Sequence, residues 1–318
     1  MQTAIIATPI TAQNLETNRL LAGICVGLIA ASIGALYTVF ARWGIQRGLH
    51  SPDLTVLRFG VAGLLTLPIL IFAMRKNRTQ FFAQWRNWLA IALLAGTPFG
   101  LLMFGALQFA PASHAAVFPF SAMSVMGMVL GTLVLGETLS RRKVLGIVIV
   151  LAGLILLSGI DASSFTLRSA LGDAMFIAAG TLWAGFGIVL RKNKLDPLLA
   201  TAVVSFSALV TYVPVYFVVT GGARLIAISP HVFWTEVLVQ GVIAGGGTLF
   251  TYAKMVSILG PARAAVFPAL APGTAALLAW PILGHLPSTF EILGLLIAMI
   301  GLLIAVTSSR RVISSRLR

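Results

Sequence analysis

The chain has 318 residues, of which 58% are hydrophobic and only 9% are charged. Soluble globular proteins carry about 25% charged residues, so this composition excludes an ordinary soluble domain and indicates a membrane protein. The net charge of +14 does not indicate a nucleic-acid-binding surface, because the basic residues fall in short clusters between apolar stretches. Cys25 is the single cysteine, which excludes an internal disulfide and a paired-cysteine metal site.

Ten apolar stretches follow one another along the chain, and each is long enough to cross a bilayer as a helix. They lie between an N-terminal segment, residues 1–19, in which we expect no removable signal peptide, and a basic tail, residues 309–318. The predicted spans are 20–41, 54–74, 88–109, 112–134, 144–160, 169–190, 197–219, 233–258, 262–284 and 290–308. We therefore predict an all-α integral membrane protein with ten transmembrane helices.

The basic residues are distributed unequally between the two sides of this ten-helix arrangement. Most of the Lys and Arg residues fall on the side that holds both termini, including the basic tail. Because short cytoplasmic loops are enriched in Lys and Arg, both termini are predicted to be cytoplasmic.

The two halves of the sequence repeat each other. The pentapeptide AAVFP occurs at 115–119 and again at 264–268, and GALY at 34–37 matches GTLW at 180–183. The glycine pair Gly146 and Gly153 likewise corresponds to Gly294 and Gly301 in the second half. The predicted repeats are residues 20–160 and 169–308. Each holds five spans, an odd number, so the second repeat enters the membrane from the opposite side, as in inverted-repeat transporters.

Each AAVFP places a proline inside a predicted helix, Pro119 in the fourth and Pro268 in the ninth. Proline removes a backbone hydrogen bond, and a membrane tolerates this best where the helix lines a cavity. We predict that both prolines kink helices at a central cavity, with Phe118 and Phe267 beside them. A kinked helix that only packs against its neighbours is the alternative.

Polar and aromatic side chains predicted at mid-membrane depth are candidates for substrate contact, since lipid offers them no hydrogen-bond partner. The candidates are Tyr37, Gln108, Trp183, Thr248 and Tyr252, with His114 at a helix end, where a water-exposed position is the simpler interpretation. Such a neutral, aromatic-rich pocket suits an amino acid or another amphipathic metabolite.

The glycines at 245–247 predict a bend or close packing in the eighth helix.

Ionisable residues within membrane spans are rare and are candidate functional groups. Arg58 can pair with Asp53 or hold a substrate carboxylate, so it is a candidate charge anchor. Asp173 and Glu236 lie near the outer ends of the sixth and eighth helices. A proton-coupling role is one interpretation of either residue, but we expect both to reach water.

Glu137 precedes a basic turn and is expected to pair with Arg141 and Arg142, whereas the second repeat has His285 at the matching position.

The repeated motifs resemble the drug/metabolite transporter superfamily, as two tandem EamA-type domains over about residues 20–308. The matching features are SPDLTVLRF (51–59), Ala115 with Pro119, Leu135-Gly136-Glu137, the paired glycines, LGDAMFIAAGTLWA (171–184) and Ala265 with Pro268. The family pattern of Gly-Glu is replaced by Gly284-His285. The resemblance implies a ten-helix carrier of the bacterial inner membrane, with a cavity lined by helices 1, 3, 4, 6, 8 and 9, often an exporter of amino acids or other small metabolites.

The sequence thus predicts a secondary transporter that works by alternating access, with no cofactor and no metal. Its expected partners are a small-molecule substrate and membrane lipid, not nucleic acid. One chain holds both repeats and can complete the site as a monomer, and the sequence leaves a dimer open. The alternatives are a non-transporting membrane scaffold or sensor and, with less support, a membrane-embedded enzyme, for which no acid–base, nucleophile or metal set is evident.

Overall fold

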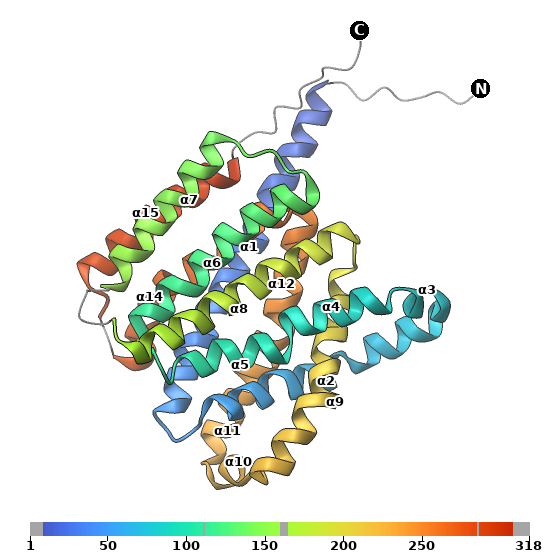
Figure 1. Ribbon diagram of the computed structural model, residues 1–318, viewed down its shortest axis with the longest axis vertical. Helices are drawn as coiled ribbons and strands as arrows, with labels where there is room; N and C mark the ends of the chain where they lie inside the picture. Colours follow the sequence, from blue (N-terminus) through green and yellow to red (C-terminus); the bar gives the residue numbers. More distant parts are fainter. Residues whose placement is uncertain (1–8, 111, 160–164, 285, 308–318) are drawn as a thin grey trace.

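The computed structural model describes residues 9–110, 112–159, 165–284 and 286–307 (Figure 1). These residues form helices and short connections, without a β-strand among them. The first half contains α1 (Pro9–Ile45), α2 (Ser51–Lys76), α3 (Arg78–Ala83), α4 (Trp85–Ala95), α5 (Thr97–Ala106), α6 (Ala112–Leu135) and α7 (Arg141–Ser158). The second half contains α8 (Leu167–Lys192), α9 (Pro197–Thr220), α10 (Ala223–Ala227), α11 (Pro230–Glu236), η2 (Val237–Gly246), α12 (Gly247–Leu259), α13 (Pro261–Ala264), η3 (Phe267–Leu270), α14 (Ala271–Leu283) and α15 (Thr289–Thr307).

Within the described residues, nine helical spans are long and apolar enough to cross a membrane. Helix α7, which corresponds to the fifth of the ten predicted spans, is not one of these nine, and its apolar part is short because its first three residues are Arg141, Arg142 and Lys143. Five spans in each half place the start of the second half on the opposite side from the start of the first. The structure confirms the predicted all-α fold of two inverted five-helix repeats. Residues 9–19, however, are already part of α1.

The third and the eighth spans contain interruptions, and each has a local cause. The third span divides into α4 and α5 at Gly96, two residues before Pro98, because proline cannot donate the next helical hydrogen bond. The eighth span contains the π-helix η2, which includes Gly241, Gly245 and Gly246. These glycines fit the bend or close packing expected there.

The two AAVFP prolines have different structural effects. Pro119 lies inside the unbroken helix α6. In the second copy, the chain divides into α13, the 3₁₀ segment η3 that contains Pro268, and α14. The two copies of this motif are therefore not equivalent, and only the second breaks its helix.

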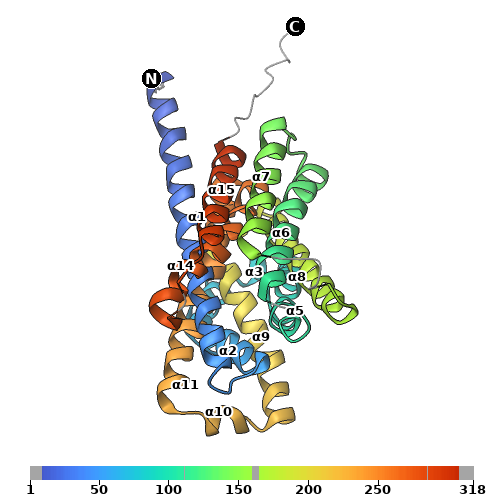
Figure 2. The same ribbon diagram turned by 90° about the vertical axis from the view of Figure 1, so that its left-hand side faces the viewer.

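Repeat-related helices pack directly against each other. Helices α7 and α15 lie side by side (Figure 1, Figure 2). Gly146 faces Gly301, and Gly153 faces Gly294, so closely that an added Cβ would lie 2.6–2.7 Å from the opposing main chain. Glycine is required there because any side chain would push the two helices apart.

The start of α1 and the end of α15 lie at one end of the molecule, and α10 and α11 lie at the other (Figure 1, Figure 2).

Candidate substrate-binding site

A wide cavity of about 460 Å³ opens at the end of the molecule opposite Pro9 and Thr307. Its rim includes Arg42 and Gln46 at the end of α1, Ser158 at the end of α7, and Glu291 at the start of α15. Its walls are mostly apolar and come from α1, α5, α6, α7 and α14. Ligand sites in proteins are commonly such concave, largely apolar cavities with a few polar groups.

A smaller cavity of about 40 Å³ lies deeper, between the two repeats. It shares Tyr37, Phe120 and Ala271 with the wide cavity, so the two cavities adjoin. The other lining residues come from both repeats: Ala30, Ala31, Gly34, Arg58, Phe99, Met123, Trp183, Thr248, Tyr252 and Pro268.

Four side chains around this inner cavity carry buried polar atoms without a hydrogen-bond partner among the described residues. These atoms are Nε and Nη1 of Arg58, Nε1 of Trp183, Oγ1 of Thr248 and the hydroxyl oxygen of Tyr252. Buried polar groups normally have partners, because an unsatisfied group costs about 1–3 kcal/mol. The inner cavity therefore offers several unused donors to a ligand that can accept hydrogen bonds.

Arg58 is the charged group of this site. Its side chain is only 2% exposed, and its Cζ lies 4.4 Å from the centroid of the Tyr37 ring. The alternative partner, Asp53, is engaged elsewhere: it accepts a hydrogen bond of 2.5 Å from the Tyr216 hydroxyl and lies 3.4 Å from Arg224. Of the two roles predicted for Arg58, pairing with Asp53 is not what the structure shows.

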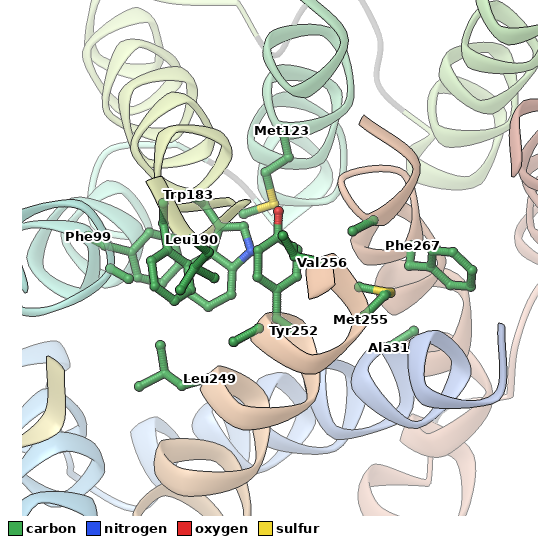
Figure 3. Close-up of a cluster of buried hydrophobic side chains, with 14 of the residues drawn as sticks. Ala31, Phe99, Met123, Trp183, Leu190, Leu249, Tyr252, Met255, Val256 and Phe267 are labelled. Atoms are coloured by element: carbon green, nitrogen blue, oxygen red, sulfur yellow. The ribbon is translucent and has the colours of Figure 1, made fainter. Parts of the chain in front are cut away.

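Aromatic rings surround the same cavity. Trp183 lies between Phe99 and Tyr252, with ring centroids 4.7 Å and 5.0 Å away (Figure 3). Tilted contacts at these distances are favourable for aromatic pairs. Helices α5, α8 and α12 thus bring rings from distant parts of the chain to one place.

Six of the predicted site residues line the inner cavity: Tyr37, Arg58, Trp183, Thr248, Tyr252 and Pro268. The other five lie outside both cavities.

Gln108 is exposed in the turn after α5, where its carbonyl oxygen accepts a hydrogen bond from Arg168. Phe118 packs near His114 and Phe165, and Phe267 packs against Gly27. The carbonyl oxygen of Pro119 faces Gly180 of α8.

His114 is fully buried, so the expected water-exposed position is wrong. Its Nδ1 lies 2.7 Å from Oδ1 of Asp173, which is itself 6% exposed. The pair joins α6 to α8 beside the rings of Phe118 and Phe165. Asp173 therefore serves as a buried partner of His114 and does not reach water freely, contrary to the expectation from its position near a helix end.

Two other charged residues also differ from expectation. Glu236 is 0% exposed, although its position in the sequence suggested contact with water. Glu137 pairs with Lys143, Nζ to Oε2 at 3.3 Å, in place of Arg141 and Arg142. The Glu137 pair lies at the beginning of α7 and ties the preceding turn to that helix. His285 lies outside the described residues.

Phe99, Phe120 and Met123 also line the inner cavity, although the sequence does not predict this. Apolar side chains are equally abundant on faces toward lipid and toward a cavity, so the sequence carries no signal that separates them. No group of three or more His, Cys, Asp or Glu side chains that could hold a metal ion occurs in the described part of the chain.

The end of the molecule near Pro9 and Thr307 is tightly packed. Gly127 and Gly131 of α6 approach Ala265 and Ala262, and an added Cβ on Gly127 would lie 2.3 Å from the Ala265 Cβ. Gly23 of α1 similarly approaches Leu259 of α12. The cavities thus open toward one end, while small residues close the other.

Comparisons with known proteins agree with this architecture. The sequence matches the EamA-like transporter family over residues 21–159 and 170–307. It is 22% identical to the uncharacterized transporter YyaM of Bacillus subtilis (strain 168), covering 81% of this chain and 85% of that protein. A solved crystal structure of a protein superposes with a TM-score of 0.68 at 19% identity, covering 92% of this chain and 99% of the other. This chain is a multi-pass membrane transporter and belongs to the EamA-like transporter family.

Proposed function

We propose that this transporter carries amino acids or similar small metabolites that combine a carboxylate with an apolar body. The observation that supports this most strongly is the buried guanidinium of Arg58 beside the ring-lined cavity, whose Nε and Nη1 have no hydrogen-bond partner among the described residues. A carboxylate is a fitting partner for a guanidinium, since hydrogen bonds between the two charged groups are stronger than those between neutral groups. The rings of Phe99, Trp183 and Tyr252 would pack against the rest of the substrate.

Transport is proposed to proceed by alternating access. The wide cavity is open at one end, while the opposite end is closed by contacts between the two repeats, such as Gly131 with Ala262. In inverted-repeat carriers, rocking of the halves exchanges the open and closed ends around a fixed central site. The adjoining inner cavity is the proposed central site.

We further propose that the protein lies in a bacterial inner (plasma) membrane with both termini in the cytoplasm and that it exports its substrate. The unequal distribution of Lys and Arg supports this orientation, and the relative YyaM is a bacterial protein. In this orientation the wide cavity faces outward. Because one chain supplies every lining residue of the site, the monomer is the proposed functional unit.

Counterflow in proteoliposomes tests the proposed substrate class. Vesicles loaded with one unlabelled amino acid at a time should take up the same labelled amino acid if it is a substrate. Tyr37→Ala and Trp183→Phe should lower this uptake, while the matched control Phe118→Ala, outside both cavities, should retain it. No counterflow with any carboxylate-bearing metabolite would refute the proposal and favour a scaffold or sensor.

Thiol labelling tests alternating access separately. In a Cys25→Ser background, a cysteine replacing Ala275 in the wide cavity should react with a membrane-impermeant reagent added on that side. A cysteine replacing Ala262 in the closed end should react from the other side only when a transported substrate is present. Reaction of Ala262→Cys at the same rate with and without substrate would contradict the mechanism.

A further inference from the structure

We propose that Glu236 is a proton-binding site and that the protonated acid is the form present when the wide cavity is open. Glu236 is the last residue of α11, directly before the π-helix η2, and its side chain is 0% exposed. Neither carboxylate oxygen has a hydrogen-bond partner among the described residues. An ionised carboxylate without water, a donor or a cation is strongly disfavoured in a protein interior. A neutral carboxylic acid avoids that cost.

Glu236 forms no ion pair within the described residues. No Lys, Arg or His nitrogen forms an ion pair with it at 4.0 Å or less. The nearby charged and titratable side chains have other surroundings. Arg47 and His231 both contact the ring of Trp43, and Arg58 lies over the ring of Tyr37. Asp53 pairs with Tyr216 and Arg224. Tyr212 donates a hydrogen bond to the Pro52 carbonyl, and Arg42 lines the wide cavity.

The polar groups beside Glu236 are the main chain of Gly44 and the side-chain amide of Gln240. Neither forms a hydrogen bond of regular geometry with the Glu236 carboxylate. Gln240 donates from Nε2 to the Tyr37 carbonyl at 2.9 Å, and its own Oε1 is a buried acceptor. Three buried acceptor oxygens, two on Glu236 and one on Gln240, therefore have no hydrogen-bond partner in the described part of the chain. Protonation of Glu236 turns one of its carboxylate oxygens into a hydroxyl group, which can donate a hydrogen bond beside Gln240.

The position of Glu236 gives that proton a route to water. An added Cβ on Gly44 would lie 2.5 Å from Oε1 of Glu236, so the carboxyl group rests directly on α1. Ala41 and Ile45 of α1, and Gln46 directly after it, line the wide cavity. Glu236 therefore lies behind the cavity wall, and a movement of the end of α1 would expose it. The acid would then release its proton to cavity water as hydronium, and rebinding would reverse the step.

Two features link this site to the substrate cavity. Gln240 connects the neighbourhood of Glu236 to Tyr37, which lines both cavities. The π-helix that begins after Glu236 is a segment where helical register can change, and such segments are frequent at functional sites. Only this link to the transport cycle rests on the proposed function, because proton binding itself can be measured without a substrate.

Infrared spectroscopy of the purified full chain tests proton binding directly. At neutral pH the wild type should show the carbonyl stretch of a buried protonated carboxylic acid, and this band should shift when H₂O is exchanged for D₂O. Glu236→Gln should remove the band. The matched control Asp173→Asn removes another buried carboxyl group, one that has His114 as its partner, and should keep it. A wild type without the band, or a band that persists in Glu236→Gln, would overturn the proposal.

Transport assays test the link to the cycle once a substrate is identified by counterflow. In Glu236→Gln, substrate accumulation driven by a pH gradient should be lost, while counterflow without a gradient should persist because glutamine resembles the neutral acid. Gradient-driven accumulation equal to the wild type, or a gradient of Na⁺ replacing that of protons, would contradict the link. Because the infrared experiment uses no substrate, failure of counterflow with every candidate would refute the proposed function while leaving proton binding independently measured.

Discussion

The guanidinium of Arg58 lies over the ring of Tyr37, with Cζ 4.4 Å from the ring centroid, at the place where the wide cavity meets the inner one. A cation over an aromatic face is held by the ring quadrupole, which contributes about 0.5–2 kcal/mol. This contact keeps Arg58 in position without consuming its Nε and Nη1 donors. The arrangement leaves the positive charge available for a ligand.

Arg58→Met should abolish counterflow of a carboxylate-bearing substrate without destabilising the protein. Methionine preserves much of the volume and removes a buried charge whose burial is unfavourable. Arg58→Lys should lower counterflow at least about tenfold, corresponding to about 1.4 kcal/mol, because an ammonium cannot reproduce the planar pair of donors. Initial counterflow rates and thermal unfolding in detergent give both readouts. A fully active Arg58→Met variant would remove Arg58 from the site.

Tyr252→Phe should leave stability almost unchanged and should lower counterflow about tenfold, or about 1.4 kcal/mol of lost interaction. The hydroxyl group is buried without a hydrogen-bond partner among the described residues, so its removal breaks no hydrogen bond with them. Tyr216→Phe is the matched control, because it removes the bond to Asp53 and should reduce stability by about 0.5–1.5 kcal/mol. The opposite pattern of stabilities would show that the two hydroxyl groups are wrongly assigned.

Asp173→Asn should destabilise the protein by about 1–3 kcal/mol, because it disrupts the buried bond to His114. The loss should appear as a lower unfolding temperature in detergent. A double-mutant cycle with His114→Phe should show that the two substitutions are not additive, as expected for residues in contact. Additive losses would mean that the pair contributes no coupling energy.

Gly153→Ala should destabilise the packing of α7 on α15 by about 1–3 kcal/mol through overpacking. The added methyl group would lie 2.6 Å from the main-chain nitrogen of Ala298. Gly246→Ala is the control, since an added Cβ there meets no atom within 4 Å. Thermal unfolding of the two variants should therefore differ clearly, and equal unfolding temperatures would contradict the close approach of the two helices.

Reporter fusions at Met1 and Arg318 should place both termini on the cytoplasmic side of the membrane. The expectation follows from an even number of spans and from the enrichment of Lys and Arg in cytoplasmic loops. A reporter that is active only in the cytoplasm, fused to each end in turn, provides the measurement. Signals from opposite sides would invalidate the inverted-repeat arrangement.

Much of the site could be predicted from the sequence because ionisable and hydrogen-bonding residues are rare in apolar spans. Tyr37, Arg58, Trp183, Thr248 and Tyr252 were selected on that ground, and all five line the inner cavity. Gln108 was selected for the same reason and instead lies exposed beyond α5. A polar residue near the end of a span satisfies its polarity in a turn as well as in a cavity, and only the position of the helix end decides between them.

The lengths of the apolar stretches and the repeated motifs determined the all-α membrane fold and the inverted repeats, because a bilayer imposes these constraints on each segment locally. The tertiary structure decided which face of each helix meets the cavity, since helices that are apolar all round carry no periodic signal for their inward face. It also decided that Asp53 pairs with Tyr216 and Arg224, that His114 meets Asp173, and that Glu236 is buried against Gly44. These contacts join residues far apart in the sequence, and their formation depends on how the two repeats pack together.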